Sequence, residues 1–333
     1  MNILKINACL LFSFLALFSF AQKSHNYKVV KTFKIQSSGG WDYIAVNGNN
    51  LFVSHGTQVN ILNKITGDSV GIIPNTSGVH GIAFDVAHNK GFTSNGRSNN
   101  STVFDLNTLK ATGVIATGQN PDAICYEPFS KTIITCNGRS NDLTIIDPVT
   151  EKVISTIPVG GKPETAVPDG AGKIFVNIED KSEVAVINMK TFVVENTWSV
   201  APGEGPTGLA YDESTQRLFV GCDNELLIVL DATTGRVVDK LKIGKGCDGV
   251  VFDKKNKLIF TSNGEGTITG IKEQSSTSFS VVGNYTTKPG ARTLILDNEK
   301  GILYLPTADF EQTSTQNERR KMIPGTFQIL VVQ

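Results

Sequence analysis

The chain has no excess of charge of either sign, with 31 lysines and arginines against 31 aspartates and glutamates. Nucleic acids and anionic membrane surfaces are recognised by strongly basic faces. The one notable basic run, Arg319 to Lys321, is too short to supply such a face. We therefore expect neither nucleic acid nor an anionic membrane as the main partner.

Cysteine is also scarce, with five residues in 333 and no Cys-x-x-Cys spacing. This excludes a disulfide scaffold and gives no support for a zinc or thioredoxin-type site. Helical periodicity is missing as well, because no segment repeats apolar residues every 3.6 positions over three turns. The protein is therefore expected to be built from strands.

Long apolar runs are absent except near the N-terminus. Lys5 precedes an apolar run from Ala8 to Phe20, and Ala21-Gln22 follows as a small-residue cleavage point. This order is typical of a secretory signal peptide, here residues 1–21. An uncleaved membrane anchor is the alternative, although the run is short for a membrane span. We expect residues 22–333 to be one exported domain, periplasmic or secreted, without membrane insertion after cleavage.

Against this background one pattern recurs seven times. A small or polar loop ends in one polar residue, and a short apolar strand follows. The polar residues are Asp42, His80, Asp122, Glu164, Thr207, Asp248 and Arg292, spaced 38, 42, 42, 43, 41 and 44 apart. Repeats of roughly 40–45 residues made of several short strands indicate a β-propeller.

Each repeat contains four predicted strands. In residues 80–120 the apolar segments GIAF, GFTSN, STVFDL and ATGVIAT are separated by turns rich in Asn, Asp, Gly and Lys. The last repeat lacks its fourth strand, while residues 27–35 read as a strand without a repeat of their own. Closing a ring removes free sheet edges. We therefore predict seven four-stranded antiparallel blades, the seventh made of residues 291–333 and 26–37.

The repeats resemble the YVTN-type (YncE-like, surface-layer-type) seven-bladed propellers. The resemblance is carried by Pro-Asp, Pro-Glu and Pro-Thr at 121–122, 163–164 and 206–207, by Phe-Thr-Ser-Asn at 92–95 and 260–263, and by the Thr-Val-Phe-Asp and Thr-Ile-Ile-Asp strands at 102–105 and 144–147. It covers essentially the whole mature chain, apart from a long loop in the last blade. It implies the fold and leaves the function open, because this group has many roles.

A propeller of this strand order gathers several polar groups on one face. The seven repeated polar residues form a ring around the channel mouth. A second shell is expected at the ends of the second strands, at His55, Asn95, Asn137 and Asn263, with Cys222 in the equivalent place. Arg97 and Arg139 occupy matching Gly-Arg-Ser-Asn loops. The loop at 308–325 has the length and polarity of a lid.

The ring carries four acids, which need compensation. Two carboxylates ~8 Å apart repel by roughly 2 kcal/mol at an effective dielectric of about 20. Arg292, protonated His80, water or a bound cation can supply it, and oxygen and imidazole donors suit Ca²⁺ or another divalent ion. No other cofactor is expected. Alternatively, these groups only hydrate the channel mouth.

We expect a monomeric binding protein that takes a small polar ligand, a glycan or an envelope protein at Asp42, His80, Asp122, Glu164, Asp248 and Arg292. The rival hypothesis is a metal-assisted lyase or hydrolase with His80 as acid or base. A third is a scaffold whose side surfaces matter instead. A disulfide between Cys222 and Cys247 is left open, because sequence gives no Cα separation.

Overall fold

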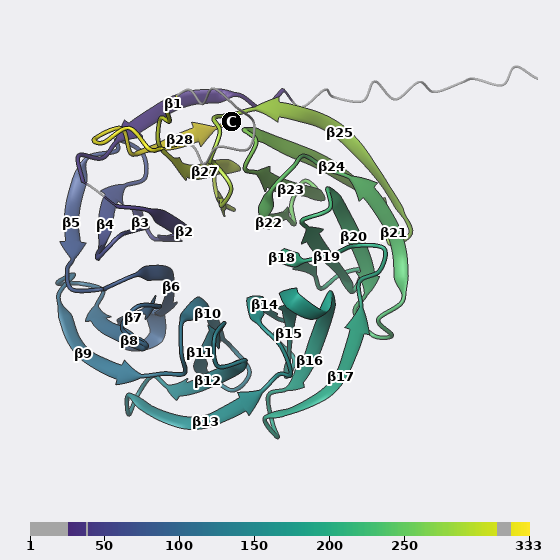
Figure 1. Ribbon diagram of the computed structural model, residues 1–333, viewed down its shortest axis with the longest axis horizontal. Helices are drawn as coiled ribbons and strands as arrows, with labels where there is room; N and C mark the ends of the chain where they lie inside the picture. Colours follow the sequence, from purple (N-terminus) through teal and green to yellow (C-terminus); the bar gives the residue numbers. More distant parts are fainter. Residues whose placement is uncertain (1–25, 38, 312–320) are drawn as a thin grey trace, which may run out of the picture.

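The computed structural model describes residues 26–333 except residue 38 and residues 312–320. Seven four-stranded antiparallel sheets surround a central axis, as Figure 1 shows in the view down that axis. The predicted seven-bladed propeller is therefore confirmed. The expected signal peptide at residues 1–21 lies outside the described residues. Within the described ranges, no helix has the length and apolar composition that a membrane span requires.

The strands occupy four positions from the axis outward. The innermost strands are β2 (Trp41–Asn47), β6 (Val79–Asp85), β10 (Pro121–Glu127), β14 (Pro163–Pro168), β18 (Pro206–Asp212), β22 (Cys247–Asp253) and β26 (Ile295–Asp297). The second strands are β3 (Asn50–His55), β7 (Lys90–Asn95), β11 (Thr132–Asn137), β15 (Lys173–Ile178), β19 (Arg217–Cys222), β23 (Leu258–Asn263) and β27 (Ile302–Thr307).

The third strands are β4 (Gln58–Asn63), β8 (Asn100–Asp105), β12 (Asp142–Asp147), β16 (Glu183–Asn188), β20 (Leu226–Asp231), β24 (Thr267–Ser275) and β28 (Gln328–Val332). The outer strands are β5 (Ser69–Ile73), β9 (Ala111–Ala116), β13 (Lys152–Pro158), β17 (Val193–Ser199), β21 (Val237–Lys242), β25 (Ser278–Thr286) and β1 (Val29–Lys34). The helical elements of the described part are two 3₁₀ turns, η1 (Val86–His88) and η2 (Glu179–Lys181).

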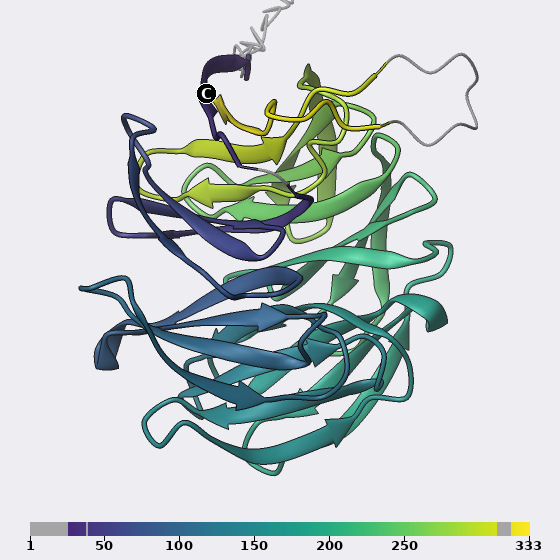
Figure 2. The same ribbon diagram turned by 60° about the vertical axis from the view of Figure 1, so that its left-hand side comes forward.

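The ring is closed by the two ends of the described chain. The strand order in the seventh blade is β1-β28-β27-β26, so the N-terminal strand is its outer strand. Figures 1 and 2 both show the purple β1 beside the yellow β28. Lys28 and Gln333 exchange two backbone hydrogen bonds at 3.0 and 3.1 Å. The predicted closure is confirmed, and it leaves no unpaired edge inside this blade.

Each interface between neighbouring blades has its own hydrophobic core. The described residues form seven buried clusters, and each joins side chains of two adjacent blades. For example, Ile134 and Leu143 of blade 3 pack with Ile174 and Val176 of blade 4. A chain longer than a single core favours can fold in this way because the cores are distributed around the ring.

Candidate functional site

The seven repeated polar residues lie at the same end of the innermost strands. Six of them are the second residue of their strand, and Arg292 precedes β26. In blades 1 to 6 the pairing between innermost and second strand shifts register immediately after the first residue. Such a bulge takes a residue out of the ladder and redirects its side chain. We refer to Asp42, His80, Asp122, Glu164, Thr207, Asp248 and Arg292 as the ring.

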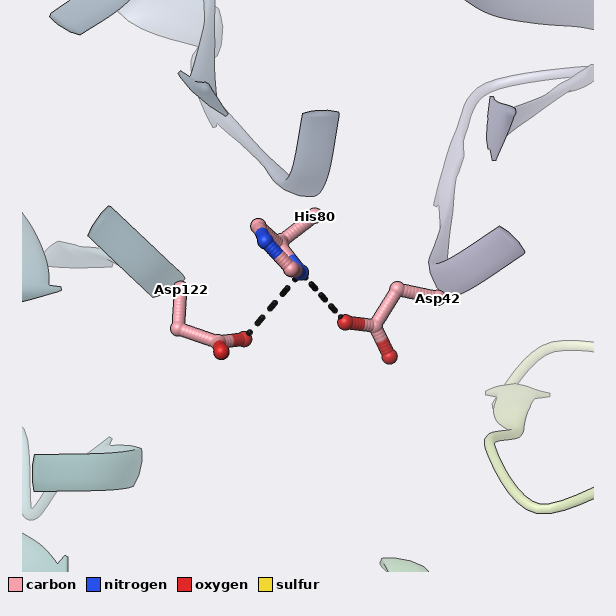
Figure 3. Close-up of side chains that lie close together, drawn as sticks. All are labelled: Asp42, His80 and Asp122. Atoms are coloured by element: carbon pink, nitrogen blue, oxygen red, sulfur yellow. Dashed lines mark hydrogen bonds and ion pairs between the residues drawn. The ribbon is translucent and has the colours of Figure 1, made fainter. Parts of the chain in front are cut away.

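Opposite charges alternate around five of the seven blades. The Nδ1 atom of His80 donates to Asp42 Oδ2 at 2.6 Å and lies 3.6 Å from Asp122 Oδ1. Figure 3 shows these three side chains, from successive blades, converging on one point. On the other side of Asp42, Arg292 Nη2 lies 3.2 Å from Asp42 Oδ1, and Arg292 Nε donates to Asp248 Oδ2 at 2.6 Å. His80 and Arg292 thus supply part of the compensation that the sequence demands.

The remaining two blades are different. Lys162 Nζ lies 3.4 Å from Glu164 Oε1, but it also pairs with Glu179 outside the ring. The other carboxylate oxygen of Glu164 is buried, and no described protein group hydrogen-bonds to it. Thr207 is buried, and its hydroxyl donates to the Cys247 carbonyl at 2.7 Å. Blade 5 therefore contributes no free polar group to the ring.

Burial makes three ring acids reluctant to ionise. Burial, with the charge of Asp42, raises the pKa of Asp122 to about 7 and that of Asp248 to about 6. Burial and then the charge of Asp122 raise the pKa of Glu164 to about 9. Burial acts in the opposite direction on His80, but its hydrogen bond to Asp42 and the charge of Asp122 leave the pKa of the imidazole raised. Near neutral pH the ring therefore holds protons that a bound cation can displace.

The second shell is a structural element of each blade. Asn137 accepts a hydrogen bond from Thr135 at 3.0 Å and donates to Asp142 and Thr144 at 2.7 and 2.8 Å. Asn95 and Asn263 repeat this pattern in blades 2 and 6. All three side chains are fully buried. Their polar atoms are used within their own blades and do not reach the ring.

His55, the fourth member of the expected shell, is also enclosed. Its ring stacks on Phe327 with the ring centres 3.8 Å apart, Ser37 bonds to Nδ1, and Nε2 lies 2.9 Å from the Gly39 carbonyl. Burial lowers the pKa of His55. This histidine tethers the segment before β2, and both of its ring nitrogens are bonded there, which leaves His80 as the ring's imidazole.

The serine of the Phe-Thr-Ser-Asn motif links neighbouring blades. Ser94 in blade 2 donates to the backbone carbonyl of Asp122 in blade 3, and Ser262 in blade 6 donates to that of Arg292 in blade 7. Asn177 takes this role in blade 4, donating to the Thr207 carbonyl at 2.8 Å. The Thr and Asn of the motif thus hydrogen-bond within their own blade. The Ser bonds to the backbone of the ring residue in the next blade and so positions it.

Tyr43 is a channel residue that the repeat analysis misses. It follows Asp42, at a position occupied by small residues in the other six blades, namely Gly81, Ala123, Thr165, Gly208, Gly249 and Thr293. With them it lines a cavity of about 230 Å³ on the axis, whose other lining residues are apolar apart from Asp248. The signal was available in the sequence, as the one large side chain in a column of small ones.

The expected lid and disulfide have separate outcomes. Half of the 308–325 loop, residues 312–320, lies outside the described residues. At its base Phe310 pairs with Met322, and the Phe310 ring lies 6.1 Å from that of Trp41, next to Asp42. The four cysteines in the described part, including Cys222 and Cys247, are free thiols, and none of them forms a disulfide.

One enzyme-like motif is a chance match. Residues 67–71 read Gly-Asp-Ser-Val-Gly, the pattern of a hydrolase nucleophile elbow. That motif requires a strand, a sharp turn and a helix. Here Ser69 begins the outer strand β5 and is exposed, and no helix follows. The ring is therefore the better candidate for chemistry.

Part of the ring has the composition of a cation site. One ligand atom each from Asp42, His80 and Asp122 lies within 4.8 Å of the other two. Two carboxylates and an imidazole are acceptable ligands for several divalent metals, and the carboxylates alone suit Ca²⁺. Since the three come from adjacent blades, the width of the channel does not prevent them from meeting at one ion.

Comparisons with known proteins identify the fold of this chain. No family model matches the chain, and no curated protein matches it. The solved structures similar to it include "Kuenenia stuttgartiensis Hydrazine Synthase", with 15% identity over 81% of this chain and 94% of that one and a TM-score of 0.71. The RRP9 WD40 repeats match with 9% identity over 92% and 98% at a TM-score of 0.76, and U3-55K with 9% over the same shares at 0.75. At such identities the likeness is one of fold, and the chain is a seven-bladed β-propeller.

Proposed function

We propose that this protein is an exported, monomeric propeller of the YVTN-type group that binds a small polar ligand through a positively charged group at the ring. The observation that carries the proposal is the excess of partly buried carboxylates. Asp42, Asp122, Glu164 and Asp248 face one arginine, one histidine and a lysine shared with Glu179. A ligand cation provides the missing partner, including one for the unbonded oxygen of Glu164.

The raised pKa values of Asp122, Asp248 and Glu164 support the same ligand chemistry. Like charges in a buried site retain protons, and an incoming cation favours the ionised carboxylates instead. Binding should therefore release protons and become tighter between pH 6 and pH 9. A lysine of an envelope protein or the amino group of a glycan presents the same chemistry as a free small cation.

The test is calorimetric titration of the purified protein with divalent cations, small amines, amino sugars and Lys-containing peptides. The double variant Asp122→Asn/Glu164→Gln should lose at least tenfold in affinity for whichever class binds. Glu195→Gln is the matched control, because Glu195 is exposed on the outer strand β17 and bonds to Asn188. Unchanged affinity in the double variant, or no binding by any class, would overturn the proposal.

A metal-assisted lyase or hydrolase is the second candidate, favoured by the grouping of Asp42, His80 and Asp122. The two carboxylates would hold a divalent ion, which would supply Lewis-acid chemistry, and His80 would move a proton. Metal analysis of the purified protein, with thermal melting in Ca²⁺ and in chelator, separates the candidates. The enzyme is supported if the protein holds a stoichiometric metal ion and if the His80→Gln variant retains this ion but loses the lyase or hydrolase activity. If neither Ca²⁺ nor chelator shifts the melting temperature, the enzyme hypothesis is overturned.

A further inference from the structure

Tyr43 is the one large side chain at a channel position that the other six blades keep small. The cavity it lines includes residues from all seven blades, so it lies on the axis. Tyr43 begins in blade 1, yet it packs against the hydrophobic cluster shared by blades 3 and 4, which contains Ala123. Gly81 holds the same position in the intervening blade 2 and has no side chain to block this path. The tyrosine thus reaches across the channel.

The phenol also lies among the ring acids. Tyr43 follows Asp42 in β2 and lines the axial cavity together with Asp248. These two carboxylates come from blades 1 and 6, on either side of blade 7, so the tyrosine lies beside acids of more than one blade. It therefore presents an aromatic face and a hydroxyl group next to the ring carboxylates.

Beyond the carboxylates the channel changes character. The axial cavity, about 230 Å³, is lined by the aliphatic residues Ile44, Ile82, Leu209 and Leu294 and others like them. Its volume corresponds to that of roughly eight water molecules at about 30 Å³ each. Such a chamber has room for a few carbon atoms and few partners for water. A polar ring, an aromatic side chain and an apolar chamber are therefore arranged along one axis.

We propose that Tyr43 is the specificity-determining residue of this pocket and that the ligand is a small organic ammonium ion. The ammonium group lies between the ring carboxylates and the face of Tyr43, and the tyrosine stands between it and the apolar chamber. Cations are attracted to an aromatic face, and more strongly when both are desolvated. A hydrated metal ion gains nothing from an aromatic face or an aliphatic chamber, because it seeks oxygen or nitrogen ligands. The inference rests on the proposed cation site and names its ligand class.

The experiment compares methylammonium, hexylammonium and Ca²⁺ by calorimetric titration of the full-length protein. Tyr43→Thr is the decisive variant, because threonine occupies this position in blades 4 and 7 and suits a strand. It should weaken methylammonium binding roughly 10-fold, since it removes the aromatic face. It should also shift the preference toward hexylammonium about 5-fold or more, since it opens the chamber to an alkyl chain of this length. Tyr43→Phe keeps the face and should stay within about 3-fold of the wild type for methylammonium.

Tyr211→Phe is the matched control, because it removes a tyrosine hydroxyl at the opposite end of an innermost strand, where a separate cavity lies. It should leave all three titrations unchanged. Binding of Ca²⁺ without any ammonium would overturn the ligand class and leave the cation site standing. Ammonium binding with the same chain-length preference in Tyr43→Thr would overturn the role of Tyr43 alone. No binding of any cation would overturn both this inference and the function it rests on.

Discussion

The ring and the second shell are both sets of polar residues repeated once per blade, yet they are used in opposite ways. Asp42, His80 and Arg292 bond to residues of neighbouring blades. Asn95 and Asn137 bond only within their own blades and are fully buried. The ring thus holds partly exposed groups that link neighbouring blades, whereas the shell holds the strands of each blade together.

The difference follows from the strand on which each set lies. Six of the seven ring residues lie in the bulge of the strand nearest the axis, where a side chain can leave the sheet. Shell residues end the second strand, with strands on both sides, so that their polar atoms must find partners inside the sheet. Repetition of a polar residue in a propeller therefore does not itself indicate a binding site.

The largest effect on stability is expected in the second shell. Asn137→Ala removes three hydrogen bonds and leaves Thr144 and Asp142 with a lost donor. We expect the free energy of unfolding to fall by about 2–3 kcal/mol, because buried partners are left unbonded. Urea unfolding measures this. Asp122→Asn, a ring change of similar size, should cost less than about 1 kcal/mol; equal losses would erase the distinction between the two sets.

Loss of Arg292 should be the most damaging change within the ring. Arg292→Leu leaves Asp42 and Asp248 facing each other without their shared cation. Because Arg292 is 39% exposed, we expect a loss of only about 1–2 kcal/mol at pH 8. The loss should shrink at pH 5, below the pKa of about 6 to which burial raises Asp248, because that carboxyl then holds a proton. Thermal melting at both values checks this, and a loss that is the same at both would contradict it.

Glu164 should make the protein less stable as the pH rises. The pKa of its carboxyl is about 9 in the folded protein and about 4.3 in the unfolded chain, so the folded state holds the extra proton between these values. Stability from this group is then full below pH 4 and declines toward pH 9. Glu164→Gln should flatten this decline. At pH 9 its free energy of unfolding should exceed that of the wild type by about 1 kcal/mol, which would appear as a higher melting temperature. Melting from pH 5 to 9 tests it, with Glu195→Gln as the variant that should follow the wild type.

The smallest effect distinguishes the two histidines without changing stability. The hydrogen bond to Asp42 and the charge of Asp122 outweigh burial and raise the pKa of His80, whereas burial lowers the pKa of His55. An NMR titration of the imidazole C–H signals should place His80 above and His55 below the ordinary value of about 6.5. Asp42→Asn should lower the pKa of His80 and leave His55 unmoved. The reverse order would mean that the ring does not hold its imidazole as described.

Much of the site was accessible from the repeat. The spacing of the polar residues placed all seven ring positions, and the charges of His80 and Arg292 identified the groups that balance the acids. The pairing was not accessible, because nothing in the repeat says that His80 lies closer to Asp42 than to Asp122. Thr207 also belonged to the repeat but turns its hydroxyl to a backbone carbonyl. Tyr43 broke the pattern of small residues, and its course across the channel depends on space left by Gly81.

The amino-acid sequence determined the blades, their number and their closure, because alternating apolar strands separated by turn residues have few other ways to bury their faces. The tertiary structure alone decided which polar residues lie together at the channel and which form all their hydrogen bonds inside one blade. Hydrogen bonding and ionisation depend on distances between residues of different blades, and those distances exist only once the ring is closed.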